Sequence, residues 1–261
     1  MINIDASVYE YVPGFPKKEY DFTLRHLASH RSGIRHYRRW EQENTRPKSM
    51  EEGLAKFQNN KLRFEPGTDY LYSSYGYNLL GIAMEKATQR SFEELLTTYV
   101  TRPLGMEHTL PDPAEYEALE TSGFFIYKGG QAREAKSVDL RLKLPSGGML
   151  STSEDLVRLG NAYTYQRILA PATQEEWMAN TPLPNGKKPG YGLGWGVSPD
   201  PKGRPRLSHT GGNTGAICKL IVYPEQRVTV ALVSNTSDVD WLRVVGEAST
   251  ISNEVLAELG R

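Results

Sequence analysis

The chain has 261 residues, which is enough for one large domain or two modest ones with a substantial buried core. Lysine plus arginine and aspartate plus glutamate both number 31, so the net charge is zero. This balance argues against a nucleic acid or an anionic membrane surface as the main partner. The single cysteine, Cys218, excludes an internal disulfide and disfavours a cysteine-based metal site.

The first residues, "MINIDASVYEYVPGFP", have neither a basic head nor an apolar run of signal-peptide length. No window approaches the roughly 18 apolar residues that a membrane-spanning helix needs. As given, the sequence therefore predicts a soluble, cytoplasmic protein with no membrane partner. A signal upstream of Met1 would change this expectation to the periplasm or an organelle.

The first two thirds of the chain carry patterns typical of helices, in which a capping residue precedes apolar residues at helical spacing. The expected helices are 23–30 with Thr23 as cap, 48–59 with Ser49 as cap, 73–88, 91–105 with a Ser91–Glu94 capping box, and 151–163 with Ser151 or Ser153 as cap. Two short strands are expected before the last of these, around "GFFIYK" (123–128) and "AKSVDL" (135–140).

The last quarter of the chain is rich in β-forming residues. After a loop with one short expected strand, "YGLGWGV", the runs "RLSHTGG", "AICKLIVYP" and "RVTVALVSN" predict three consecutive antiparallel strands. A helix over roughly 239–259 closes the chain. The predicted class is α+β, with a mostly helical region at 23–165 and antiparallel strands plus a helix at 190–261. Such a small sheet has an unpaired edge that must be covered.

The stretch "EPGTDYLYSSYGYNLLG" (65–81) places a phenol and a hydroxyl at the start of a helix. Tyr72 has an ordinary pKa of about 10, so it becomes useful in proton transfer only if nearby cations favour the phenolate. The structural alternative is that Tyr72 anchors the start of the helix. Ser74 could donate to a substrate carbonyl or act as the N-cap.

The stretch "SHTGGNTGA" (208–216) sets an imidazole, a hydroxyl and a bare backbone N–H in a row at a strand end. Glycine lets a substrate approach the main chain, so this combination suits an oxyanion site. The alternative is a bulge or a strand-to-turn junction.

His26 and His30 could share a metal at i, i+4, but no HExxH arrangement or third ligand accompanies them. No phosphate loop is present, so no metal or organic cofactor is expected.

Four segments together resemble one family, the serine β-lactamase-like hydrolases. These are "TLRHLASHRSGIRHY", "FEPGTDYLYSSYGYNLLG", "PSGGMLSTSEDLVRLGNA" and "LSHTGGNTGA…VYPEQRVTVALVSN", in the family's order across about residues 2–236. The family includes class C β-lactamases, DD-peptidases and family VIII carboxylesterases, and the resemblance is closest to its mitochondrial branch. It implies a single β-lactamase-like domain over 1–261 and hydrolysis of an ester or amide of a small substrate by acyl transfer.

The resemblance also implies roles for particular residues. Tyr72 and Ser74 take the positions of the second motif, Tyr-x-Asn or Tyr-x-Ser, so Tyr72 would assist proton transfer. The third motif falls on His209, Thr210 and Gly211, with His209 supplying the electropositive group beside Tyr72. The N–H of Gly212 would form half of the oxyanion hole. Serine at 74 and histidine at 209 depart from the commonest pattern, so efficient β-lactam turnover is not expected.

The family's nucleophile is the serine of Ser-x-x-Lys, and no serine here has lysine at the third following position. The N-terminal segment resembles the part just after that motif, which implies a truncated chain without the first helix and strands. Three interpretations stay open: a truncated hydrolase, a hydrolase using another serine or an activated water, and a non-catalytic module that binds ligands or self-assembles as a homo-oligomer through the sheet edge. Substitute nucleophiles would be Ser32, Ser146 or Ser208.

Overall fold

The computed structural model describes residues 2–38, 41, 49–112, 123–136, 138–237 and 241–260. Its helices are α1 (Val8–Tyr11), α2 (Leu24–Ala28), α4 (Met50–Leu54), α5 (Ser74–Thr88), α6 (Phe92–Leu96), α7 (Arg102–Leu104), α8 (Leu144–Gly147), α9 (Ser153–Thr164), α10 (Pro171–Met178) and α11 (Trp241–Glu258). A π-helical turn (Thr97–Thr101) joins α6 to α7, and a 3-10 turn (Arg141–Lys143) precedes α8. The strands are β1 (Leu110–Pro111), β2 (Phe125–Lys128), β3 (Gln131–Glu134), β4 (Met149–Leu150), β5 (Leu207–Asn213), β6 (Ala216–Tyr223), β7 (Val228–Ser234) and β8 (Thr236–Ser237).

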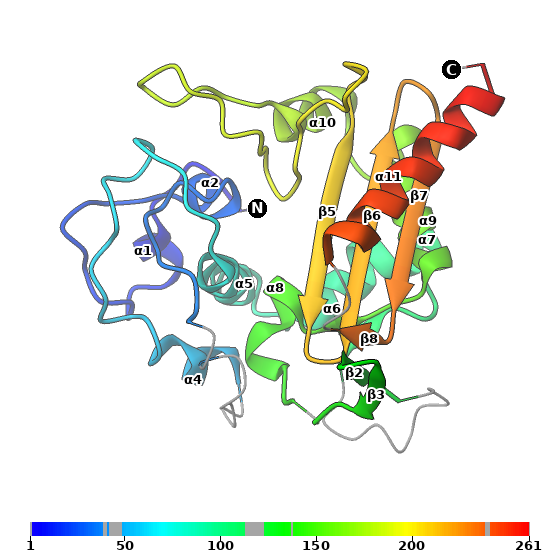
Figure 1. Cartoon of the computed structure of the whole chain (residues 1–261). Coiled ribbons are helices and arrows are strands. Elements are labelled where there is room, and N and C mark those ends of the chain that lie inside the picture. The colour runs from blue at the N-terminus through cyan, green and yellow to red at the C-terminus, as the bar shows by residue number, and fades with distance from the viewer. Residues whose placement is uncertain are drawn as a thin grey trace.

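The main sheet consists of β5, β6 and β7 in that order, antiparallel throughout. Successive side chains point to opposite faces, so each face can bury its own apolar set. On one face Ile221 and Tyr223 pack against Leu256 of α11, and on the other Leu207 and Leu220 pack against α9. The sheet is therefore the middle layer between two helices, as Figure 1 shows.

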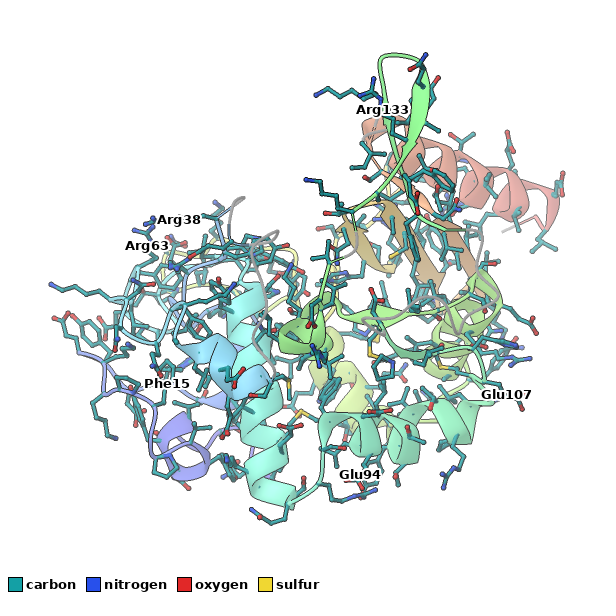
Figure 2. All side chains as sticks on the ribbon, turned by 90° about the horizontal axis from the view of Figure 1, so that it is seen from below. Phe15, Arg38, Arg63, Glu94, Glu107 and Arg133 are labelled. Carbon is teal, nitrogen blue, oxygen red and sulfur yellow. The ribbon has the colours of Figure 1, made fainter. Side chains whose placement is uncertain are left out.

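The helices α1, α2, α4 and α5 lie on the β5 side of the sheet and share a core around α5 (Figure 1). Tyr75, Leu79 and Ile82 lie on one side of α5 and are almost completely buried. They belong to one cluster with Leu27 of α2 and with Phe15, which Figure 2 labels. Burial of large side chains of this kind stabilises by about 1.5–3 kcal/mol each, so α5 is held firmly where its first turn meets the site.

Most expected elements are confirmed. The three C-terminal strands, the closing helix and the 73–88 helix are present, and the caps of three expected helices are confirmed at Thr23, Ser49 and Ser91. Two expected caps were wrong by one residue. Ser73, not Ser74, accepts the N–H of Gly76 at the start of α5, and Thr152, not Ser151 or Ser153, caps α9. Adjacent hydroxyl residues compete for the same capping position, and the sequence pattern does not separate them.

Two expected strands were also wrong. Residues 135–136 and 138–140 form no strand, because β2 turns at Gly129–Gly130 and pairs with β3 instead, while residue 137 lies outside the described ranges. The segment "YGLGWGV" forms isolated bridges at Gly196 rather than a strand.

The β2–β3 hairpin projects from the end of the sheet, with Arg133 pointing away from the body (Figure 2). Of the helices in the described ranges, none combines the length and apolar character needed to cross a membrane.

Candidate active site

Tyr72 lies in a cluster of aromatic rings just before α5. Its ring centroid is 4.2 Å from that of His30 and 5.6 Å from that of His36. The rings of Tyr191 and His209 are 6.3 and 6.2 Å away. Tyr72 is 37% exposed, whereas Tyr191 is 8% exposed and His30 only 1%. Tyr72 is therefore more accessible to a substrate than Tyr191 or His30.

Two histidines hold the backbone next to Tyr72. His30 Nδ1 accepts the N–H of Ser73 at 3.0 Å, and His36 Nδ1 accepts the N–H of Ser74 at 3.1 Å. A neutral imidazole whose Nδ1 accepts a hydrogen bond carries its proton on Nε2. Burial lowers the pKa of both rings, to about 3 for His30. Both histidines are therefore neutral at neutral pH and act as acceptors for the first N–H groups of the helix entry.

His209 reaches the same cluster from β5. Its Nε2 lies 3.1 Å from the hydroxyl oxygen of Tyr191. Burial is the main cause that lowers the pKa of His209, and Lys219 lowers it further, although a hydrogen bond to the Thr210 backbone raises it. The imidazole is therefore uncharged at neutral pH. The electropositive role that the resemblance implies for His209 stays a prediction, and among the described residues no carboxylate pairs with this ring to favour its charged form.

The phenol of Tyr72 is protonated in these surroundings. Burial, and then the nearby Tyr37, raise the pKa of Tyr72, and no cation appears among the causes of the shift. The condition set by the sequence for a phenolate base is therefore not met by the described residues. A phenol of this kind donates a proton more readily than it accepts one.

The outer edge of β5 is open beyond Ser208. Ser208 N–H donates to Gly196 O at 2.8 Å, and Gly196 N–H donates back at 2.9 Å. Backbone N–H groups alternate in direction along a strand, so those of Thr210 and Gly212 point to this same edge. Within the described ranges no strand pairs there past Ser208. Gly212 therefore offers the kind of unpaired N–H that stabilises an oxyanion.

The two glycines of the motif, Gly211 and Gly212, differ in what a side chain at each position would contact. A side chain at Gly211 would place its Cβ 2.5 Å from Sγ of Cys218 on the paired strand, so the sheet requires glycine there. A Cβ at Gly212 would meet nothing within 4 Å. The space in front of Gly212 is open, which fits the approach of a substrate to the main chain.

The other predicted site residues occupy different surroundings. Ser74 is buried, and its N–H rather than its hydroxyl bonds to His36. Ser32 is buried and its hydroxyl accepts a backbone N–H two residues on, and the Ser146 hydroxyl donates to a carbonyl three residues before it. Ser208 precedes His209 along β5, so its side chain lies on the opposite face of the sheet. No hydrogen bond among the described residues joins these three hydroxyls to Tyr72 or His209.

A buried lysine that no sequence motif indicated lies near this cluster. Lys143 is 5% exposed, and its Nζ lies 4.4 Å from the ring centroid of Tyr37, whose ring is 3.9 Å from that of His36. Burial, and then Lys56, lower the pKa of Lys143 to about 8. The only sequence signal was a lysine beside "PSGGML", which carries no periodic pattern. Lys143 is thus connected to Tyr72 through two rings.

Among the described residues, no group of three or more histidine, cysteine, aspartate or glutamate side chains converges on one point. His26 and His30 do not share one site, since His26 Nδ1 accepts the N–H of Thr23 and His30 Nδ1 that of Ser73. A cavity of about 200 Å³ adjoins the end of β5, lined among others by Asn213, Thr214 and Leu150. It lies beside the Gly212 end of the strand and does not include Tyr72.

Comparison with known proteins agrees with this fold and these motifs. The Beta-lactamase family model matches residues 1–248, and the chain belongs to that family. The human mitochondrial serine beta-lactamase-like protein LACTB is 28% identical over 321 residues, which cover 86% of this chain and 58% of that protein. The family resemblance and the β-lactamase-like fold expected from the sequence are therefore confirmed.

Two solved structures show the same fold. The D-amino acid amidase from Ochrobactrum anthropi SV3, complexed with L-phenylalanine, is 21% identical with a TM-score of 0.82, covering 100% of this chain and 78% of that one. The octameric penicillin-binding protein homologue from Pyrococcus abyssi is 24% identical with a TM-score of 0.77, covering 90% of this chain and 57% of that one. At these identities the likeness concerns the fold.

Proposed function

We propose that this chain supplies the proton-transfer and oxyanion groups of a β-lactamase-like hydrolase that cleaves an ester or amide of a small substrate by acyl transfer. The observation that carries the proposal is the position of Tyr72, a partly exposed phenol in ring contact range of His209 on β5. The same strand carries the open N–H of Gly212 a few residues further on. Family membership and an amidase of the same fold support this reaction class.

The protonated phenol defines the role of Tyr72. The nucleophile's oxygen bonds to the carbonyl carbon, and the N–H of Gly212 stabilises the negative charge that develops on the carbonyl oxygen. The bond to the leaving group then breaks. Tyr72 gives its proton to the departing oxygen or nitrogen and regains the proton that the nucleophile loses. Water repeats the sequence on the acyl group and releases the acid.

Three sources of the nucleophile are compatible with this chain. The chain spans 58% of the length of LACTB, and the family's Ser-x-x-Lys is absent from its sequence. The nucleophile would come from a Ser-x-x-Lys segment of a longer form, from Ser32, Ser146 or Ser208, or from an activated water. These sources differ in whether a serine of this chain becomes covalently labelled.

The test is hydrolysis of short-chain p-nitrophenyl esters by the purified chain, combined with intact-mass detection of fluorophosphonate labelling. Hydrolysis with one labelled serine supports the proposal and identifies the nucleophile by peptide mapping. Hydrolysis without label supports an activated water. If a folded sample shows neither, the three candidate serines and an activated water are excluded as the nucleophile of these 261 residues. The proposal is then overturned if a longer form that carries Ser-x-x-Lys also fails to hydrolyse the esters.

A second candidate function is a self-assembling module, which the edge of β7 favours. Within the described ranges, β7 pairs with β6 alone, and its seven residues carry no charge. Val233 on this edge is 41% exposed. Natural edge strands usually carry charges or prolines that prevent pairing with another chain. Mass measurement at several concentrations tests this candidate, and a strict monomer throughout would exclude it.

A further inference from the structure

Two lysines lie close together beside Tyr37, in a part of the fold that the proposed chemistry does not use. Lys143 ends the 3-10 turn before α8, is 5% exposed, and has its Nζ 4.4 Å from the ring centroid of Tyr37. Lys56 follows α4 and is near enough to lower the pKa of Lys143. We call Lys143 and Lys56 the lysine pair. It sets two positive charges near each other, one of them with little access to water.

The carboxylate beside the lysine pair is already occupied. Lys56 Nζ donates to the backbone carbonyl of Glu41 at 3.4 Å. The side-chain oxygens of Glu41 accept two hydrogen bonds from Arg35, at 2.7 and 2.8 Å, and one from the N–H of Arg38 at 2.6 Å. Of the ion pairs among the described residues, none includes Lys143 or Lys56. The charge of the lysine pair is therefore not matched by an ion pair within the described part of the chain.

The ring of Tyr37 compensates the buried amine only in part. The face of a tyrosine attracts a cation more weakly than a carboxylate at hydrogen-bond distance does. Burial, and then Lys56, lower the pKa of Lys143 to about 8, whereas contact with an anion would raise it. Tyr37 and Lys56 are themselves only half-buried, so the amine of Lys143 lies close to the surface. The lysine pair is therefore suited to an anion that comes from solution.

We propose that the lysine pair binds the carboxylate group of a small molecule. A carboxylate presents two acceptor oxygens that share one negative charge, which suits two neighbouring ammonium donors. The lysine pair adjoins the candidate active site, because the ring of Tyr37 is 3.9 Å from that of His36 and Tyr37 also raises the pKa of Tyr72. On the proposed function, the carboxylate comes either from one end of the substrate or from a separate small acid.

NMR of protein labelled with carbon-13 at Cε of lysine measures binding to the lysine pair without any need for turnover. The Lys143 signal is assigned by its loss in Lys143→Met and, independently, in Lys143→Arg. In sodium chloride we expect this signal to titrate with a pKa of about 8. Saturating sodium acetate at the same ionic strength should raise this pKa by about one unit or more, because a bound anion favours the charged amine. One unit corresponds to about tenfold stronger binding of acetate to the charged amine than to the neutral one.

Two further lysine variants separate a specific site from a general effect of anions. Lys56→Met removes one positive charge of the lysine pair, so acetate should raise the pKa of Lys143 by less than in the wild type. Lys61→Met is the matched control, since Lys61 is exposed and is not among the causes that shift the pKa of Lys143. The response of its Lys143 signal to acetate should match that of the wild type.

Monomethyl glutarate, a carboxylate with an ester at its other end, distinguishes the two sources of the carboxylate. The ring signals of Tyr72 are assigned by their loss in Tyr72→Phe. If monomethyl glutarate shifts the signals of both Tyr72 and Lys143, the carboxylate belongs to the substrate. A shift of the Lys143 signal alone identifies a separate acid as the ligand. Both results support a carboxylate site at the lysine pair.

Two results would overturn the inference. One is a Lys143 signal that titrates with the same pKa in acetate as in chloride. The other is a pKa in chloride at or above the ordinary lysine value of about 10.4, which would mean that the protein itself supplies the anion. Carboxylate binding without ester hydrolysis counts against the proposed function alone. Ester hydrolysis without carboxylate binding counts against this inference alone, so the two failures are distinguishable.

Discussion

His30 contacts Tyr72 in two ways at once. Its ring lies 4.2 Å from the ring of Tyr72, and its Nδ1 accepts the N–H of Ser73, the residue that follows Tyr72 and caps α5. One buried imidazole thus fixes the side chain and the backbone of the candidate acid together. His30 itself has a φ of 58°, which places its ring under Tyr72 at a conformational cost.

We therefore expect His30→Ala to lower the free energy of unfolding by about 2–4 kcal/mol, because it leaves a cavity and an unpaired buried N–H. Urea denaturation measures this change. His36→Ala is the matched control, since His36 accepts the neighbouring N–H of Ser74 but is only half-buried. Its decrease in the free energy of unfolding should therefore be smaller. Equal losses from the two variants would contradict this account of His30.

The second prediction concerns Tyr72 itself. Tyr72→Phe should reduce ester hydrolysis by about 10²–10⁴-fold, the range for loss of a general acid, while stability changes little because the ring stays in place. Burial raises the pKa of Tyr72, so the wild-type rate should not fall through loss of the phenolic proton until the pH exceeds the ordinary tyrosine value of about 10. Full activity in a folded Tyr72→Phe protein would contradict the assigned role. Tyr70→Phe serves as the control for loss of a neighbouring hydroxyl.

The sequence was sufficient for elements whose pattern is local. Alternating apolar residues predicted β5 to β7, and the apolar face of 73–88 predicted α5 with nearly its observed bounds. The sequence was not sufficient where two neighbouring residues could play the same role or where a strand lacks apolar residues in alternation. Ser73 and Ser74 are equivalent as caps in sequence, and the β3 strand at Gln131–Glu134 is exposed throughout, so no apolar alternation marked it.

For the candidate site, the motifs predicted that Tyr72 and His209 would lie near each other, and their ring centroids are 6.2 Å apart. The site was not predictable where distant segments meet. His30 and His36 contact Tyr72 across some forty residues of sequence, and Tyr191 reaches His209 only through the bridge at Gly196. The charge state of His209 also depends on burial by the whole fold, which no local pattern reveals.

The third prediction compares the two glycines of β5. Gly211→Ala should destabilise the protein by about 1–3 kcal/mol, because its Cβ would lie 2.5 Å from Sγ of Cys218 and one strand must move. The Cβ that Gly212→Ala adds would lie in open space, so we expect this variant to have near wild-type stability. The added methyl group lies on the sheet face opposite to the His209 side chain and leaves the N–H of Gly212 in place, so hydrolysis should also stay near that of the wild type. Thermal unfolding and ester hydrolysis measured on both variants separate these effects.

The last prediction concerns the pH dependence that Lys143 imposes. Its pKa is lowered to about 8 in the folded protein, against an unfolded value of about 10.5. Between these values the unfolded chain binds more protons, so the contribution of Lys143 to stability rises with pH. Below about pH 8 the folded protein bears the full cost of a buried charge, since the amine contacts a ring and no carboxylate among the described residues.

Lys143→Met should therefore be more stable than the wild type at pH 7 by about 2–3 kcal/mol, and the difference should shrink as the pH approaches 10. Urea denaturation across this pH range measures both effects. Lys61→Met, at an exposed lysine, controls for the general loss of a charge and should give a small, flat difference. A Lys143→Met protein that is less stable at pH 7 would mean that the folded state stabilises the charged amine, and Lys143 would then be the permanent cation that the site otherwise lacks.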